Sequence, residues 1–273
     1  SYSTVSRIDY SSDTSTTVEK GPLTSARYGP GATGDSSYGY WGAGYYNKST
    51  VDRVDYSNDT ATASPKGPLS LARDSASGVS SRINGISLVS AANIINPDSE
   101  TGSGYWAHQY DTTFDWNSKY DLAAGPAYGY IAGGGGPTKS TISRIDYSND
   151  SATPTTKGPM SATSYGLAGT GNTSYGYFAG GNPSSGNSTV SRTDYSNDTA
   201  TGVTKGPLSL ARRWIGAVGN NSYGYFAGGD ISPGPGYTTV IDRIDYSNDT
   251  ATAVEKGPLG QGPQTGKYSG TGN

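Results

Sequence analysis

The sequence predicts an all-β chain that forms one β-propeller domain over residues 1–273, with six blades of four strands each. Two recurring segments and one absent pattern support this prediction. The glycine-rich aromatic segment appears as SYGYWGAG (37–44), AYGYIAGGGG (127–136), TSYGYFAGG (173–181) and SYGYFAGG (222–229). A segment of the form R-x-D-Y recurs between them, and no stretch has the 3.6-residue period of an amphipathic helix. Repeats of four short strands at this interval are typical of propellers.

The spacing of the repeats sets the number of units. The R-x-D-Y arginines are separated by 46, 91, 48 and 51 residues, so the interval of 91 is predicted to hold two units. Gly85 follows Arg73 by the same twelve residues that separate Arg27 from Gly39, and is therefore predicted to open a second strand. The predicted units are 3–44, 49–91, 105–134, 140–181, 188–229 and 239–273.

Each unit reads as four strands separated by turn residues. IGAVG (215–219) is typical of strand one, SYGYFAGG (222–229) of strand two, STVDRVDYS (49–57) of strand three and ATAVEKGPL (251–259) of strand four. Strand three alternates, which places Val51, Arg53 and Asp55 on one face and Asp52, Val54 and Tyr56 on the other. Paired glycines after strand two are expected where the chain turns too tightly for a side chain. They are Gly133, Gly134, Gly180, Gly181, Gly228 and Gly229.

The two ends of the sequence are expected to share the closing blade. The chain starts within a strand-three segment, and KYSGTGN (267–273) resembles a strand one, but neither end carries a SYGYFAGG segment. Three explanations stay open: a truncated chain, a closing blade of three strands, or a fourth strand from a neighbouring chain in a homo-oligomer. We favour truncation.

The repeated charged motifs are interpreted as structural. Arg and Asp two residues apart lie on one strand face and can bridge blades, whereas a ligand rarely needs five identical sites. The S-N-D-T/S segments are interpreted as turns, with calcium binding or glycosylation at Asn58, Asn149, Asn197 and Asn248 as the alternatives. The R-x-D pairs are Arg7 and Asp9, Arg53 and Asp55, Arg144 and Asp146, Arg192 and Asp194, and Arg243 and Asp245.

An irregular segment breaks the repeat and is a candidate partner surface. Exposed aromatic residues off the repeat pattern favour protein contacts, although a blade that fills its core differently would also use them. The candidate residues are Tyr105, Trp106, His108, Tyr110 and Trp116.

Composition excludes several functions. The net charge of −3, without a basic cluster, argues against nucleic-acid binding, and no apolar run is long enough for a membrane helix. The chain has no Cys and one His, His108, and no G-x-S-x-G. We therefore expect no enzymatic activity, no metal site and no cofactor.

Three segments together resemble the kelch repeat. They are GYFAGG (224–229), VSRTDYSND (190–198) and GPLSLAR (206–212). The regular copies depart from the family in lacking the Trp of the fourth strand. The Gly/Tyr/Ser-rich composition resembles the kelch-like proteins of marine bacteriophages and bacteria.

This resemblance implies a six-bladed kelch-like propeller with a non-enzymatic role. It implies a virion protein, associated with a phage tail or capsid, or a protein displayed on a cell surface. Its loops would contact other structural proteins or surface glycans. The alternatives are a secreted lectin-like propeller and a kelch-type adaptor for protein interactions.

Overall fold

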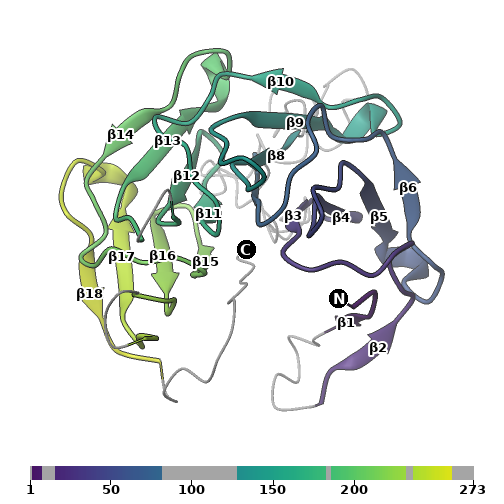
Figure 1. Cartoon of the computed structure of the whole chain (residues 1–273), viewed down its shortest axis with the longest axis horizontal. Coiled ribbons are helices and arrows are strands. Elements are labelled where there is room, and N and C mark those ends of the chain that lie inside the picture. Colours follow the sequence, from purple (N-terminus) through teal and green to yellow (C-terminus); the bar gives the residue numbers. More distant parts are fainter. Residues whose placement is uncertain (1, 8–15, 82–127, 183–185, 232–235, 260–273) are drawn as a thin grey trace, which may run out of the picture.

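The chain forms a multi-blade β-propeller in a computed structural model that describes residues 2–7, 16–81, 128–182, 186–231 and 236–259. The described strands build four antiparallel sheets of four strands and one of two strands. Figure 1 shows them as blades in an arc around a central axis, with the β1–β2 sheet and the β15–β18 blade at its two ends. The predicted all-β propeller with four-stranded blades is confirmed.

Successive segments of the chain form successive blades. The two-stranded sheet has β1 (Val5–Arg7) and β2 (Val18–Lys20). The first blade has β3 (Gly31–Gly34), β4 (Tyr38–Gly42), β5 (Val51–Asp55) and β6 (Ser64–Lys66). The second has β7 (Ser77–Ser80), β8 (Tyr128–Ala132), β9 (Ile142–Asp146) and β10 (Thr155–Lys157). The third has β11 (Ala168–Gly171), β12 (Tyr175–Ala179), β13 (Val190–Asp194) and β14 (Val203–Lys205). The fourth has β15 (Gly216–Gly219), β16 (Tyr223–Ala227), β17 (Ile241–Asp245) and β18 (Val254–Lys256).

The second blade differs from the predicted arrangement. Strand β7 pairs directly with β8, with Ser77 opposite Ala132 and Ser80 opposite Gly129. Because one edge of a strand accepts one neighbour, β8 takes the position predicted for the segment opened by Gly85. Residues 82–127, which include most of the predicted 105–134 unit, lie outside the described residues. A sixth blade stays a prediction.

Small residues on the first strands allow the blades to meet near the axis. Neighbouring inner strands contact each other from β3 to β7, from β7 to β11 and from β11 to β15. A Cβ atom on Gly78 would collide with the carbonyl of Ala32, and one on Gly169 would lie 2.7 Å from a methyl group of Val79. This crowding explains why the first strands carry Gly and Ala.

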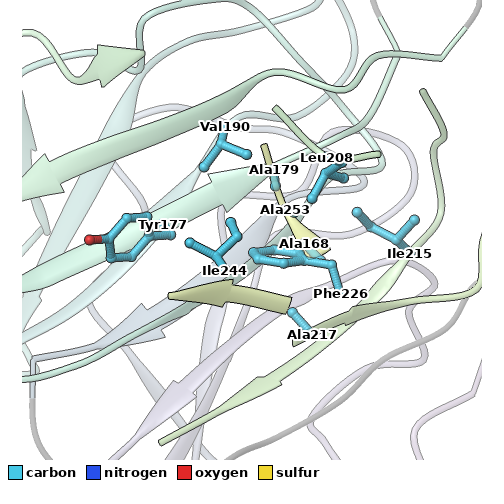
Figure 2. Close-up of a cluster of buried hydrophobic side chains, with 10 residues drawn as sticks. All are labelled: Ala168, Tyr177, Ala179, Val190, Leu208, Ile215, Ala217, Phe226, Ile244 and Ala253. Carbon is cyan, nitrogen blue, oxygen red and sulfur yellow. The ribbon is translucent and has the colours of Figure 1, made fainter. Parts of the chain in front are cut away.

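The hydrophobic core lies between adjacent blades. Figure 2 shows one such cluster, in which Tyr177 and Val190 of the third blade join Phe226 and Ile244 of the fourth. Leu208, from the G-P-L segment, completes the contact. Full burial of each of these large side chains contributes about 1.5–3 kcal/mol to folding.

The third strand of the first blade, β5, carries buried residues on both of its faces. Val51 and Asp52 point to opposite faces, as the alternation predicts, yet both are buried. The first blade packs against the β1–β2 sheet on one face and the second blade on the other, so alternation does not separate core from solvent here. Tyr56, predicted on the same strand, instead begins a 3-10 helix at Tyr56–Asn58.

Candidate functional site

The most regular polar feature is a carboxylate clamped between two blades. Asp150 accepts hydrogen bonds from Arg53 Nη1 at 2.7 Å and Tyr40 Oη at 2.9 Å, and its other oxygen lies 3.3 Å from Lys66 Nζ. Asp150 belongs to the second blade and the other three residues to the first. We call this arrangement the inter-blade carboxylate cluster.

The cluster repeats around the arc. Asp198 is held by Arg144 at 2.8 Å, Tyr130 at 3.1 Å and Lys157 at 3.1 Å. Asp249 is held by Arg192 at 2.8 Å, Tyr177 at 2.9 Å and Lys205 at 3.0 Å. In the contact between the β1–β2 sheet and the first blade, Asp59 pairs with Arg7 at 2.7 Å and Lys20 at 3.1 Å.

The R-x-D-Y aspartates have a different part from the one predicted for them. Asp55 accepts hydrogen bonds from the backbone N–H and the hydroxyl of Ser57, at 2.9 and 2.6 Å, and so caps a 3-10 turn. Asp146, Asp194 and Asp245 cap the equivalent turns, and Asp9 lies outside the described residues. Four of the arginines instead pair with the Asp of the next blade's S-N-D-T/S turn, namely Arg7, Arg53, Arg144 and Arg192. These segments are therefore turns that also supply the inter-blade acceptor.

The contacts around Asp249 lower the pKa of its carboxyl group. Burial raises the pKa of Asp249, but hydrogen bonds from Lys205 and Tyr177 and the charge of Arg192 outweigh it and leave the pKa below its ordinary value. Four of the R-x-D-Y arginines also stack on a tyrosine, and the Arg53 guanidinium lies 4.2 Å from the Tyr38 ring centre. Arg144, Arg192 and Arg243 stack on Tyr128, Tyr175 and Tyr223 in the same way. The cluster is suited to hold blades together rather than to bind a ligand.

Two sets of glycines occupy positions that a side chain would not fit. The Gly206 N–H donates to the Asp249 carbonyl at 2.9 Å, and a Cβ atom on Gly206 would collide with the carbonyl of Ala251. Gly21, Gly67 and Gly158 of the other K-G-P segments are placed in the same way. The paired glycines after strand two adopt positive φ, from 64° to 121°. These are Gly133, Gly134, Gly180, Gly181, Gly228 and Gly229.

A second buried arginine lies inside each of three blades. Arg27 pairs with Asp52 at 2.6 Å, and Arg212 pairs with Asp242 at 3.1 Å. The equivalent Arg73 faces Ser143 and donates to its hydroxyl at 2.9 Å. Arg27 and Arg73 marked the spacing of the repeats, but no structural role was predicted for these three arginines. All three end an L-A-R or S-A-R segment, and for Arg27 and Arg212 a further signal was the Asp just before the R-x-D-Y arginine, Asp52 or Asp242.

Aromatic side chains, three of them exposed and two half-buried, gather on loops at one end of the blades. Tyr45 and Tyr46 follow strand two of the first blade, whereas Tyr28, Tyr165 and Trp214 precede strand one of the first, third and fourth blades. Tyr46 is 82% exposed, and Tyr28 and Tyr45 are also exposed. We call these five residues the aromatic face.

A depression of about 590 Å³ lies within the aromatic face. Its lining combines Tyr28 and Tyr45 of the first blade with Tyr165 and Trp214 of the third and fourth. Between them in blade order lies the second blade, which contributes Asp74, Ser75 and residues 135–138.

Backbone strain concentrates in the same loops. Within the described residues, the non-glycine positions with positive φ are Ala43, Tyr46, Asn47, Ser75 and Trp214. All five belong to the loops that carry or adjoin the aromatic face. Residues held in such conformations cost about 1–3 kcal/mol each and cluster at functional sites. The positions of these side chains are therefore built into the fold.

The partner surface predicted in the irregular segment lies outside the residues that the structure describes. Tyr105, Trp106, His108, Tyr110 and Trp116 lie outside the described residues. Within the described ranges, no helix has the length and apolarity to cross a membrane, and no three acidic or histidine side chains converge as metal ligands would.

The fold, rather than the sequence, connects this chain with known proteins. No protein-family model matches the sequence, and no curated protein matches it. The structure is similar to the solved structure of YjhT, with a TM-score of 0.58 and 11% sequence identity. The similarity covers 88% of this chain and 68% of YjhT. At this identity the likeness shows the fold alone, which is that of a multi-blade β-propeller.

Proposed function

We propose that this chain is a non-enzymatic binding propeller of the kelch-like type, which contacts its partner through the aromatic face. The observation that carries the proposal is the division of the molecule into two kinds of surface. The blade-to-blade surfaces repeat the same clamped aspartate, while the loops at one end depart from the repeat and expose Tyr28, Tyr45 and Tyr46.

The blade-to-blade surfaces support a scaffold role for the propeller. Asp59, Asp150, Asp198 and Asp249 are each held by an Arg and a Lys from the preceding sheet or blade. Such charge-assisted contacts fix the blades relative to one another. Loops on a rigid framework can vary without disturbing the fold, which suits them to binding.

The exposed tyrosines of the aromatic face support a partner with a polar surface. Tyrosine offers a large contact area at low cost in conformational entropy, and its hydroxyl suits a polar partner. Surface glycans and structural proteins both present such surfaces. The resemblance to phage and bacterial kelch-like proteins further supports display on a virion or a cell surface.

The test starts from native source material. We expect peptides of this chain to sediment with virus particles or cell envelopes rather than at the 28.1 kDa of the free chain. Purified chain should then rebind to the stripped particles or envelopes, and Tyr46→Ala should weaken this rebinding at least tenfold. Val203→Ala is the matched control, because Val203 is 52% exposed on the outer strand β14, away from the aromatic face.

The sedimentation experiment and the rebinding experiment can each contradict one part of the proposal. Peptides that stay at the mass of the free chain argue against surface display. Equal rebinding by the Tyr46→Ala and Val203→Ala chains would show that the aromatic face is not the contact surface.

A further inference from the structure

We propose that the depression in the aromatic face binds an organic cation that carries N-methyl groups, such as the quaternary ammonium of a choline-type group. This inference rests on the proposed function, because it names the chemical group that the face recognises. The cation can be free or attached to a larger partner, and the chemistry of recognition is the same.

The arrangement of the rings is the first argument. Tyr28 and Tyr45 pack edge to face, with ring centres 6.0 Å apart, and Tyr165 and Trp214 pack with centres 5.6 Å apart. The second blade separates the two pairs in blade order, so the depression has aromatic rings on both sides of Asp74. Ring faces carry the negative end of the aromatic quadrupole and attract cations, most strongly for Trp and Tyr.

The charge of the lining is the second argument. Asp74 is the charged side chain among the lining residues, and its Oδ1 accepts a hydrogen bond from the Gly135 N–H at 3.1 Å. An anionic ligand would meet this carboxylate unfavourably, whereas a cation gains from the carboxylate and the rings together. A neutral sugar could use the rings but would lose the charge contribution.

The ammonium group of the neighbouring Lys139 does not act as the cation of this site. Lys139 donates from Nζ to the carbonyls of Gly135 at 2.7 Å and Pro137 at 2.9 Å, so two of its protons are directed to the backbone. Burial and the nearby Arg73 lower the pKa of Lys139, although Asp74 opposes them.

We infer a methylated cation because a methylated ammonium loses less hydration on entering the site than a primary ammonium does. A primary ammonium holds its water strongly, and the rings offer it few hydrogen-bond acceptors in return. A methylated ammonium keeps its charge, is weakly hydrated and presents apolar surface to the rings. The volume of about 590 Å³ falls within the range of small-molecule sites and leaves room for a substituent on the cation.

The framework holds the rings in place before a ligand arrives. Trp214 has φ of 57°, its backbone N–H donates to the Gly166 carbonyl at 2.6 Å, and a Cβ atom on Gly166 would lie 2.6 Å from the Trp214 ring. The Tyr165 hydroxyl accepts a hydrogen bond from Asn182 Nδ2 at 2.9 Å. Rings that are already fixed lose little entropy on binding.

The experiment compares a cation with its neutral isostere on the full chain. Choline is titrated by calorimetry or ligand-observed NMR, and 3,3-dimethyl-1-butanol, which replaces nitrogen by carbon, is titrated in parallel. We expect choline to bind at least tenfold more tightly than the neutral alcohol. Asp74→Asn should remove most of this preference, Trp214→Ala should weaken choline at least tenfold, and Val203→Ala should change neither.

A conservative variant keeps the test decisive even if the Trp214→Ala chain does not fold. Trp214→Phe keeps a ring at the position, and we expect it to retain the fold by circular dichroism and to bind choline more weakly than the unmodified chain. If Trp214→Ala unfolds, the Trp214→Phe and Asp74→Asn chains carry the test.

The outcomes separate this inference from the proposed function. Equal affinity for choline and the neutral alcohol, or no binding of either, overturns the cation site. Binding of neutral monosaccharides in place of choline, lost in the Trp214→Ala chain, overturns it as well. In both cases the proposed function stands if Tyr46→Ala still weakens rebinding to the particles or envelopes, and it falls with the inference if Tyr46→Ala has no effect.

Discussion

Arg73 is a buried arginine for which the described residues supply no carboxylate partner, and this makes the second blade a place where stability can be added. Arg73 is fully buried and donates to the carbonyls of Ile131, Gly133 and Thr141 and to the Ser143 hydroxyl. In the first and fourth blades the position of Ser143 is an aspartate that pairs with the equivalent arginine. We predict that Ser143→Asp stabilises the protein.

The pKa of Arg73 sets the size of the effect. Burial lowers this pKa from 12.5 to about 10, so near neutral pH the buried charge opposes folding and is relieved only above about pH 10. Restoring the ordinary pKa would contribute about 3 kcal/mol, because each pKa unit corresponds to about 1.4 kcal/mol. Burying the new carboxylate offsets part of this gain. We expect a net gain of about 1 kcal/mol in the free energy of unfolding.

The third blade offers a matched control. Ser191 is buried at the same position, but Ser164 stands where the other blades have arginine. Ser191→Asp therefore buries a carboxylate without its cation, at a cost of about 3 kcal/mol or more. Urea unfolding at pH 7 measures both variants. The reasoning is refuted if Ser143→Asp destabilises the protein as much as Ser191→Asp does.

Two further predictions concern the inter-blade contacts. Gly206→Ala should lower the melting temperature, because its Cβ would collide with the Ala251 carbonyl, whereas Gly257→Ala should not, because no described atom lies within 4 Å of its Cβ. Equal shifts in a thermal melt would contradict this. The pKa of Asp249 lies below its ordinary value of 3.8, so its contribution to stability is present above that pH and is lost as the pH falls through the lowered pKa. Asp249→Asn should cost about 2 kcal/mol at pH 7 and reduce the loss of stability between pH 5 and 2. A variant whose acid unfolding follows that of the original chain would show that Asp249 does not contribute.

Local patterns in the sequence determined the strands and turns. The SYGYFAGG segment is strand two in the third and fourth blades, and the glycines that follow it adopt positive φ. These features depend on residue alternation and on the freedom of glycine, both of which act over a few neighbouring residues. The propeller followed from their repetition.

Pairings over long sequence separations could not be obtained in the same way. Arg53 meets Asp150 rather than Asp55, although Asp55 is two residues away, because the 3-10 turn occupies Asp55 and the next blade presents Asp150. Likewise β7 pairs with β8 across the intervening residues 82–127, where the spacing of Gly85 predicted a nearer partner.

By itself, the sequence determined the all-β propeller, because its repeated strands can bury their faces only against one another. The tertiary structure alone decided which aspartate each arginine contacts and which loops meet around the depression. Tyr28, Asp74 and Tyr165 occupy one position of the repeat, directly after Arg27, Arg73 and Ser164, and Trp214 lies one position later in its own repeat. The residue type changes from blade to blade, and these side chains come together only because successive blades bring their loops to one end. Repetition specifies a framework, whereas this candidate site consists of the positions at which the repeats differ.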